Sequence, residues 1–413
     1  MTLDVRVPPA PSDRRARAAV AVLFLTNGAL FANILPRFPQ IKADLDIGNA
    51  AYGLAVAAFP TGAIVAGLAA GVFVRRFGSA RVAVAGTLLT ALGILAAGVA
   101  RSVLVFAAAL FLAGAMDAIT DVGQNAHGLR VQRRYGRSII NSFHAIWSIG
   151  AVLGGSMAAG AIALDLSRGQ HLAVSGVIFT VAACVALRFC LPGPEVEPAA
   201  ESDAGKGERA AEAGASTAGR RRTYVLAALV LIAMAGALVE DAGSSWAALY
   251  LSDSLHATAV LAASGYIALV GAQFVGRLVG DRLVDRFGQR AVARVGGLVA
   301  AAGMGLALAV PTVPGTILGF AAAGLGVATL VPAAMHEADE LPGLRPGTGL
   351  TIVSWLMRLG FLLSPPAVGL VADAAGLRLG LLVVPFAGVI VIALAGVLQT
   401  RRRQGPPRPV NSR

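Results

Sequence analysis

Long apolar blocks separated by short polar turns dominate the 413-residue chain. A transmembrane helix needs about 20 consecutive apolar residues to cross a hydrocarbon core about 30 Å thick. The blocks have this length and show no period-two alternation, which favours helices over the strands of a membrane barrel. The pattern predicts an all-α polytopic membrane protein with twelve spans, at roughly 17–36, 50–74, 81–100, 102–126, 139–163, 170–191, 223–251, 258–280, 291–310, 313–335, 348–372 and 378–400.

Three polar segments divide this pattern. Residues 1–16 are rich in proline and arginine and predict a cytoplasmic N-terminal tail, and residues 401–413 predict a C-terminal one. Residues 192–222 contain too few hydrophobic side chains to pack and predict a flexible cytoplasmic linker. We therefore expect two six-helix halves, at 17–191 and 223–400.

A short charged turn occurs twice. Val74-Arg75-Arg76-Phe77-Gly78 recurs as Val284-Asp285-Arg286-Phe287-Gly288, 210 positions later, between apolar blocks in both cases. A repeat of about half the chain length predicts two homologous halves.

Composition and charge agree with a membrane protein. Charged residues make up 14% of the chain, against about 25% in soluble domains, and the mean hydropathy is +0.74. The net charge of +12 comes from arginines that concentrate in the loops on one side, if both termini lie in the cytoplasm. This is the positive-inside pattern, so we expect a multi-pass protein of the inner (plasma) membrane with no nucleic-acid partner. The two cysteines, Cys184 and Cys190, lie on one predicted helix and offer neither a disulfide framework nor a metal cluster.

Acidic residues inside the predicted spans are the first functional candidates, because ionisable groups are costly in the membrane. Asp117, Asp121 and Asn125 recur every four residues and line one helical face. A carboxylate kept from water can exchange a proton near neutral pH. Asp117 is therefore a candidate proton carrier, with a structural ion pair or hydrogen bond as the alternative. Asp121 lies nearer the basic loops and is either hydrated, paired with an arginine, or part of the coupling.

Two further charged positions lie in the second half. Glu240 and Asp241 are adjacent, so they point about 100° apart, and we favour Glu240 as a coupling residue. Arg358 lies near the middle of its span and requires a counter-charge, for which Asp117 and Glu240 are both candidates. Arg358 either fixes helix packing or binds an anionic group of a solute.

Neutral polar and aromatic side chains complete the candidate binding site. Amide and imidazole groups could bind a polyol or amide, and the indoles of Trp147 and Trp355 could stack on a sugar face or a cation. Trp246 lies near the end of its span, where a membrane-interface role is equally consistent. The substrate-binding candidates are Asn27, Asn33, Asn125, His144, Trp147, Gln273, Trp355 and Arg358.

The charged turns resemble the loop signature Gly-x-x-x-Asp-Arg-x-Gly-x-Arg of the major facilitator superfamily. The segment from Asp285 through Arg286 and Gly288 to Arg290 matches its second part, but Asp281 occupies the position of the leading glycine. In the first copy Gly71, Arg76 and Gly78 match, whereas Arg75 replaces the aspartate. The resemblance implies that Asp285, Arg286 and Arg290 form a state-dependent latch at the cytoplasmic helix ends, whereas topology signals are the alternative.

Other residues resemble the MosC-like branch of that superfamily, which includes YbjJ-like proteins and is near the fucose-permease-type transporters. These residues are Asn27-Gly28, Asp121-Val122, Asn125-Ala126, Phe143-His144, Trp147-Ser148 and Gly150, and the resemblance covers all twelve spans. It implies a secondary transporter, not an enzyme, that rocks its halves about a site near the bilayer midplane.

The favoured hypothesis is proton-coupled transport of a small polar, sugar- or polyol-like solute, without metal or other cofactor, by a monomer. A proton-driven efflux pump for drugs or metabolites is the alternative. Asp117-x-x-x-Asp121 also resembles a metal-diphosphate motif of membrane prenyltransferases, but the chain contains no second such motif. A receptor built on a transporter fold is a further alternative, with no extra soluble domain to favour it.

Overall fold

The computed structural model describes residues 10–135, 139–193, 215–344 and 347–399. Every regular element within these ranges is a helix. Twelve helical segments are long and apolar enough to cross a membrane. The predicted all-α architecture with twelve spans is therefore confirmed.

The first six spans contain nine helical elements, since the first two spans are each interrupted. They are α1 (Pro11–Ile34), η1 (Leu35–Arg37), α2 (Phe38–Asp44), α3 (Asn49–Val56), α4 (Ala58–Phe77), α5 (Ser79–Gly98), α6 (Val103–Tyr135), α7 (Ile140–Ala163) and α8 (Arg168–Leu187).

The second six spans contain eleven helical elements, because spans 7, 10, 11 and 12 each consist of more than one. They are α9 (Ala215–Leu249), η2 (Tyr250–Ser254), α10 (Ala259–Phe287), α11 (Gln289–Ala309), α12 (Val313–Val327), α13 (Leu330–Asp339), α14 (Thr348–Leu356), α15 (Arg358–Ala375), α16 (Leu377–Gly380), α17 (Val383–Leu394) and η3 (Ala395–Val397).

The helices extend beyond several of the expected boundaries. Helix α1 starts at Pro11, inside the segment expected to be a tail, and α9 starts at Ala215, inside the expected linker. The rest of that linker, residues 194–214, and residues 400–413 lie outside the described ranges.

The internal repeat is visible in the backbone. Helices α4 and α10 both end at a glycine with positive φ, Gly78 at 84° and Gly288 at 83°. Each glycine N–H bonds back to the carbonyl of the equivalent valine, Val74 or Val284. Side chains rarely adopt this conformation, so glycine is required at both positions.

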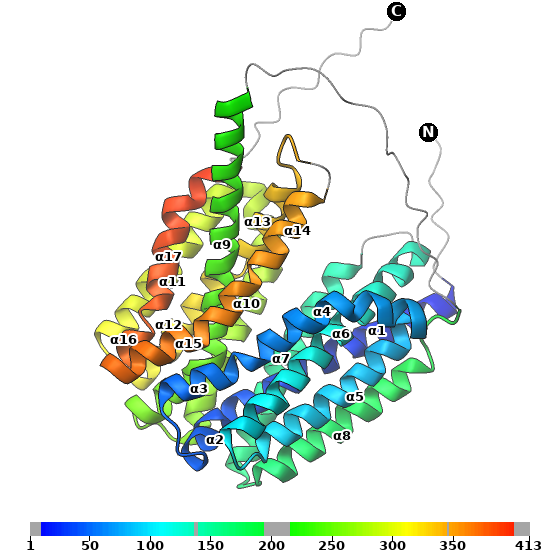
Figure 1. The fold of residues 1–413 in the computed structure, drawn as a ribbon, viewed down its shortest axis with the longest axis vertical. Coiled ribbons are helices and arrows are strands. Elements are labelled where there is room, and N and C mark those ends of the chain that lie inside the picture. Colours follow the sequence, from blue (N-terminus) through cyan, green and yellow to red (C-terminus); the bar gives the residue numbers. More distant parts are fainter. Residues whose placement is uncertain (1–9, 136–138, 194–214, 345–346, 400–413) are drawn as a thin grey trace, which may run out of the picture.

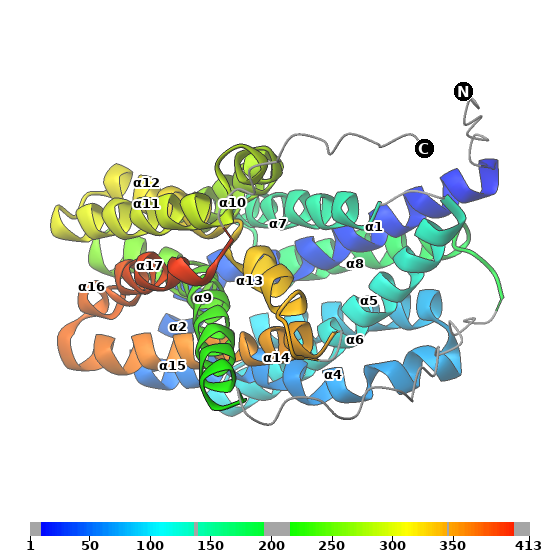
Figure 2. The same ribbon diagram turned by 90° about the horizontal axis from the view of Figure 1, so that it is seen from above.

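The two halves form separate bundles that converge at one end and diverge at the other (Figures 1 and 2). The arginine-rich turns after α4 and α10 lie at the diverging end, which we call the basic end. Helices α2, α3, α15 and α16 lie at the converging end, which we call the far end. The halves contact each other mainly through α3 with α15 and α7 with α10.

The outer surface of both bundles is apolar. Leu68, Leu104 and Leu306 are 77%, 79% and 68% exposed, and each lies on a membrane-spanning segment. Lipid covers such positions at no cost, whereas a soluble protein rarely exposes so many large apolar side chains.

Candidate functional site

Asn27 joins three helices of the first half. Its Nδ2 donates to Asp117 Oδ1 of α6 at 2.7 Å. Its Oδ1 accepts from Trp147 Nε1 of α7 at 2.8 Å and from Gln124 Nε2 of α6 at 3.3 Å. Three of the predicted residues, Asn27, Asp117 and Trp147, are therefore in direct contact.

A glycine permits this contact. A Cβ added to Gly28 would lie 2.1 Å from the carbonyl oxygen of Trp147, far inside van der Waals contact. Only glycine allows α1 and α7 to approach this closely, and the approach brings the Asn27 amide within reach of the Trp147 indole.

The face of α6 that was predicted to be polar is present. Asp121 Oδ1 accepts from Asn125 Nδ2 at 2.9 Å and from Gln124 Nε2 at 3.2 Å. These residues lie three and four positions apart, as neighbours on a helix do. Within the described residues Asp121 forms no ion pair with an arginine, so neutral amides hold it in place.

A second polar cluster lies in the other half. Glu240 Oε2 of α9 accepts from Gln273 Nε2 of α10 at 2.7 Å and lies 3.6 Å from Arg277 Nη2. The side chains of Arg277 and Glu240 are 34% and 20% exposed, although both lie deep within their spans. The contact between the halves therefore does not enclose them.

Arg277 connects the two clusters. Its Nη1 donates to Ser148 Oγ of α7 at 3.2 Å, and Ser148 directly follows Trp147. The two clusters thus meet at the adjacent residues Trp147 and Ser148 of α7, although no hydrogen bond joins these two side chains among the described residues. We call the set of Asp117, Asn27, Trp147, Ser148, Arg277 and Glu240 the chain of polar groups. It crosses from one half to the other about 12–15 Å from the basic end of α7 and α10, at 1.5 Å per residue.

Neither of the two counter-charges expected for Arg358 pairs with it in the structure. Asp117 bonds to Asn27, and Glu240 pairs with Arg277, so neither is the counter-charge of Arg358. Gln273 and Arg277 lie four residues apart on one face of α10, which packs directly against α9. This i,i+4 spacing was the available signal for Arg277, which the sequence analysis did not assign to the site.

Other candidates lie apart from the chain of polar groups. Asn33 is buried and bonds to the His171 ring at 2.8 Å and to the Ala29 carbonyl at 2.8 Å, inside the first bundle. His144 is exposed, with its ring 5.2 Å from that of Phe24. Asp121 and Arg277 are the charged groups that interact with it.

The remaining candidates lie on span 11. Trp355 is 50% exposed at the end of α14, and Arg358 is partly exposed at the start of α15. Neither makes a hydrogen bond or ion pair to the polar chain within the described residues.

The charged turns make few polar contacts. Arg76 and Arg286 lie over the rings of Phe77 and Phe287, at 5.4 and 5.3 Å. Arg290 Nε donates to the Leu398 carbonyl at 3.0 Å and so holds the end of span 12.

The acidic residues of the second turn differ from the arginines. Asp281 and Asp285 are exposed, and within the described residues neither forms an ion pair. Gly71 lies partly exposed one turn before Arg75, whose side chain is its nearest neighbour. The latch assigned to these turns stays a prediction.

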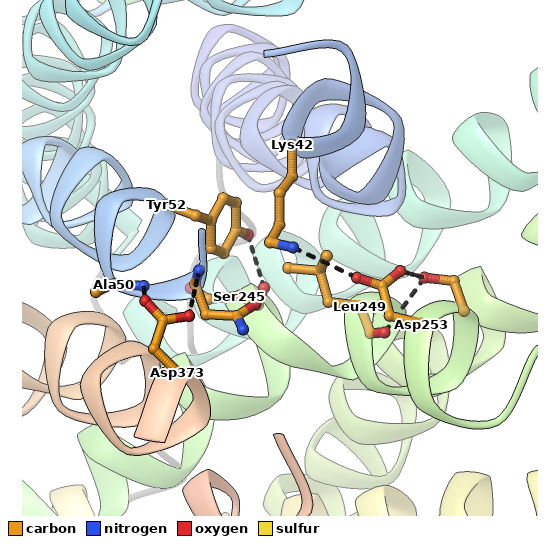
Figure 3. Close-up of polar contacts among 9 residues, drawn as sticks. Lys42, Ala50, Tyr52, Ser245, Leu249, Asp253 and Asp373 are labelled. Atoms are coloured by element: carbon orange, nitrogen blue, oxygen red, sulfur yellow. Dashed lines mark hydrogen bonds and ion pairs between the residues drawn. The ribbon is translucent and has the colours of Figure 1, made fainter. Parts of the chain in front are cut away.

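At the far end, polar contacts join the halves directly (Figure 3). Asp373 of α15 accepts from the backbone N–H groups of Asn49 and Ala50, at 2.8 and 2.9 Å, where α3 begins. Tyr52 Oη donates to the Ser245 carbonyl of α9 at 2.8 Å. Lys42 Nζ lies 3.6 Å from Asp253 Oδ2. We call these contacts the far-end gate.

Close packing accompanies the gate. A Cβ on Gly53 would lie 2.3 Å from the Pro365 carbonyl oxygen. Trp246 is wholly buried with its ring 5.0 Å from that of Tyr52, so it is not a membrane-interface residue. The sequence analysis did not identify the gate.

Comparison with known proteins shows which family this chain belongs to. The family model of the Major Facilitator Superfamily matches residues 20–284 and 245–413, which together include nearly the whole chain. The chain belongs to the major facilitator superfamily. It is 31% identical to the membrane protein MosC of Rhizobium meliloti over 399 residues, 97% of this chain and 94% of MosC. The resemblance to this superfamily and to its MosC-like branch is confirmed.

Solved structures of superfamily members share the fold. The D323A mutant of the nucleoside transporter NupG covers 93% of this chain and all of its own, with a TM-score of 0.72 at 11% identity. The D-xylose-proton symporter covers 93% of this chain and 96% of its own, with a TM-score of 0.66 at 15% identity. These structures show the shared fold. The family model and the curated relatives, two of which are named as transporters, show that the chain is a membrane transporter of the superfamily type.

Proposed function

We propose that this protein is a secondary active transporter that moves a small polar, sugar- or polyol-like solute by alternating access and couples this movement to protons. The observation that carries the proposal is the chain of polar side chains that joins the two halves through Ser148 and Arg277. Polar groups inside a membrane are costly and are found where solutes or ions pass. A site shared by both halves is what rocking of one half against the other can expose alternately.

The proposed orientation places the basic end in the cytoplasm, as the positive-inside rule requires. The polar contacts of the far-end gate then close the outer side. Within the described residues, the bond from Arg277 to Ser148 is the hydrogen bond between halves nearest the basic end. The conformation is therefore best interpreted as inward-facing.

The solute class follows from the groups that are present. Asn27, Gln124 and Gln273 offer amide donors and acceptors, which suit hydroxyl groups better than a fixed charge would. The Trp147 indole gives an apolar face next to them, and half-buried Arg277 retains donors beyond those used by Glu240 and Ser148. Two structural neighbours are named for a nucleoside and for D-xylose, and both of these solutes contain a sugar.

Asp117 is the proposed proton carrier. Its carboxylate accepts a hydrogen bond from the same Asn27 that contacts Trp147. A proton on Asp117 would remove the negative charge from this acceptor and weaken the bond, because charge-assisted hydrogen bonds are about twice as strong as neutral ones. The freed Asn27 amide could then bind a solute hydroxyl, which links proton binding to solute binding.

Reconstituted protein tests this function. Proteoliposomes with an interior pH dye are screened with polyols, pentoses, nucleosides and cationic drugs under an imposed pH gradient. We expect solute-dependent proton flux for a sugar-like solute, and its direction distinguishes uptake from efflux.

The matched variant is Asp117→Asn, which keeps the shape and the acceptor for Asn27 but cannot carry a proton. It should reduce the solute-dependent flux to the level of protein-free liposomes. Asp165→Asn, which changes an exposed carboxylate at the far end, should leave the flux unchanged. Undiminished flux in Asp117→Asn would exclude Asp117 as the carrier.

A further inference from the structure

Asp241 follows Glu240 on α9 but faces a different helix. Glu240 points to Gln273 and Arg277 of α10. Asp241 lies against α15, where the Ser364 hydroxyl is within hydrogen-bonding reach of its carboxylate. Ser245, one turn further along α9, has its hydroxyl 3.4 Å from Asp241 Oδ1. The two adjacent carboxylates therefore belong to separate environments.

The surroundings of Asp241 do not offset the negative charge of its carboxylate. Its Oδ2 atom is buried and accepts no hydrogen bond within the described residues. The Ser364 hydroxyl has one proton, which is shared between the Asp241 carboxylate and the Leu238 carbonyl 3.3 Å away, so it compensates the carboxylate only in part. No arginine or lysine of the described chain forms an ion pair with Asp241. A buried, unpaired carboxylate is strongly unfavourable.

The geometry of the oxygens suits a small cation. The hydroxyl of Ser245 is 3.4 Å from Asp241 Oδ1, beyond the 2.5–3.0 Å of an ordinary O–H···O bond. The site thus groups a carboxylate with two serine hydroxyls, and Asp241 Oδ2 is left without a hydrogen-bond donor among the described residues. Carboxylate and hydroxyl oxygens are the donors that hard cations prefer.

We propose that Asp241, Ser245 and Ser364 form a second cation site of this transporter, which binds a monovalent cation, either a proton or Na⁺. The site is separate from Asp117 and from the chain of polar groups described above. It would neutralise the Asp241 carboxylate and bring α9 and α15 together.

The position of the site connects it to the far-end gate. The Ser245 carbonyl is the acceptor for Tyr52 Oη in the gate (Figure 3). Ser364 is followed by Pro365, whose carbonyl packs against Gly53 of α3. Both serines that border Asp241 thus belong to segments that touch α3. A cation that joins these segments favours the closed far end, and its release favours opening.

Few other titratable groups near Asp241 could produce a response to cations. The groups that interact with it are Tyr52 of α3 and Glu240 of its own helix, while α15 contributes the uncharged Ser364. A response to cations can therefore be assigned by comparing variants at positions 240 and 241.

Thermal unfolding of the full-length, solute-free protein in nanodiscs tests the site. One series replaces choline chloride with sodium chloride at constant ionic strength and pH, and a second varies pH in choline chloride alone. If Na⁺ is the occupant, the melting temperature rises saturably with sodium chloride, because a ligand that binds only the native state stabilises it. If a proton is the occupant, the melting temperature in choline chloride rises as pH falls, because the protonated form is the balanced one. The pH series uses Asp117→Asn protein in place of the wild type, so that the proposed proton carrier does not contribute to the response.

Asp241→Asn should lose whichever response the starting protein shows, which is the wild type in the sodium series and Asp117→Asn in the pH series. In choline chloride at high pH it should melt no lower than the wild type, because the amide has the same shape and removes the unbalanced charge. Glu240→Gln should keep the wild-type response. If Na⁺ is the occupant, Ser364→Ala should keep the response but weaken the apparent affinity by about tenfold, equivalent to one lost ligand.

Two results would overturn the proposal. One is a wild-type melting temperature that responds neither to Na⁺ nor to pH. The other is a sodium response of the wild type, or a pH response of Asp117→Asn, that persists when Asp241→Asn is introduced. Because no solute is present, either result is independent of whether the proposed sugar transport is correct.

Discussion

Replacing Asp373 with alanine removes the carboxylate that joins the two halves at the start of α3. The carboxylate accepts two backbone N–H groups, from Asn49 and Ala50, at 2.8 and 2.9 Å. These groups lie in the first turn of α3, where no carbonyl of the helix can accept from them. Loss of a capping side chain costs about 1 kcal/mol, and the exposure of Asp373 to solvent argues against a larger value. A change of about 1 kcal/mol shifts the ratio of far-end-closed to far-end-open molecules about fivefold.

Spin labels at the far end measure this ratio. Leu164 at the end of α7 and Val310 after α11 are 74% and 61% exposed and lie in different halves. Cysteines introduced at these two positions in a cysteine-free background carry the labels. In double electron–electron resonance, Asp373→Ala should increase the population with the long distance about fivefold relative to the population with the short, closed distance. Asp373→Asn, which keeps one acceptor without the charge, should fall between alanine and wild type. Asp165→Asn is the control, since it removes an exposed carboxylate at the same end that forms no hydrogen bond or ion pair across the halves among the described residues.

An unchanged distance distribution in Asp373→Ala would refute this reasoning. It would mean that the packing of α3 against α15 closes the far end without help from the carboxylate. The Gly53 contact with the Pro365 carbonyl would then be the main closing interaction.

Two further predictions separate packing from solute binding. Gly28→Ala should lower the stability in a thermal unfolding assay by about 1–3 kcal/mol, the usual cost of overpacking, because the added Cβ would meet the Trp147 carbonyl. Gly160→Ala is the control and should be neutral, because the space around its added Cβ is open. Asn33→Ala should lower the melting temperature, since it leaves the buried ring of His171 without its partner. It should not change the apparent affinity for the solute in the proteoliposome assay. A change in that affinity would show that Asn33 contributes to solute binding.

The sequence predicted the spans and the repeat because both depend on local composition. A run of apolar residues specifies a membrane helix whatever its neighbours are. The equivalence of Gly78 and Gly288 could also be predicted, because each ends a helix within its own segment. The helical face of Asp117, Asp121 and Asn125 followed from their spacing alone.

The partners of these residues were harder to predict, because they lie on other helices. The sequence analysis considered Glu240 as a counter-charge of Arg358 and did not consider Arg277. The i,i+4 spacing places Gln273 and Arg277 on one face of α10, but only the packing of α10 against α9 shows that this face meets Glu240. The gate was not predictable for a second reason. Asp373 binds backbone N–H groups of residues more than 300 positions away, and every residue except proline has such a group.

The far-end gate helps to explain why the two charged turns differ. Arg76 and Arg286 make the same contact in both copies, so the turns differ mainly where Arg75 replaces the equivalent of Asp285. In this conformation the far end is closed by the gate, and Asp285 has no ion pair among the described residues. A group that forms no ion pair in one state gives that state no ionic stabilisation. If the proposed alternating access is correct, we expect Asp285 to act in the opposite state, in which the basic ends would approach each other and the gate contacts at Asp373 and Tyr52 would be broken.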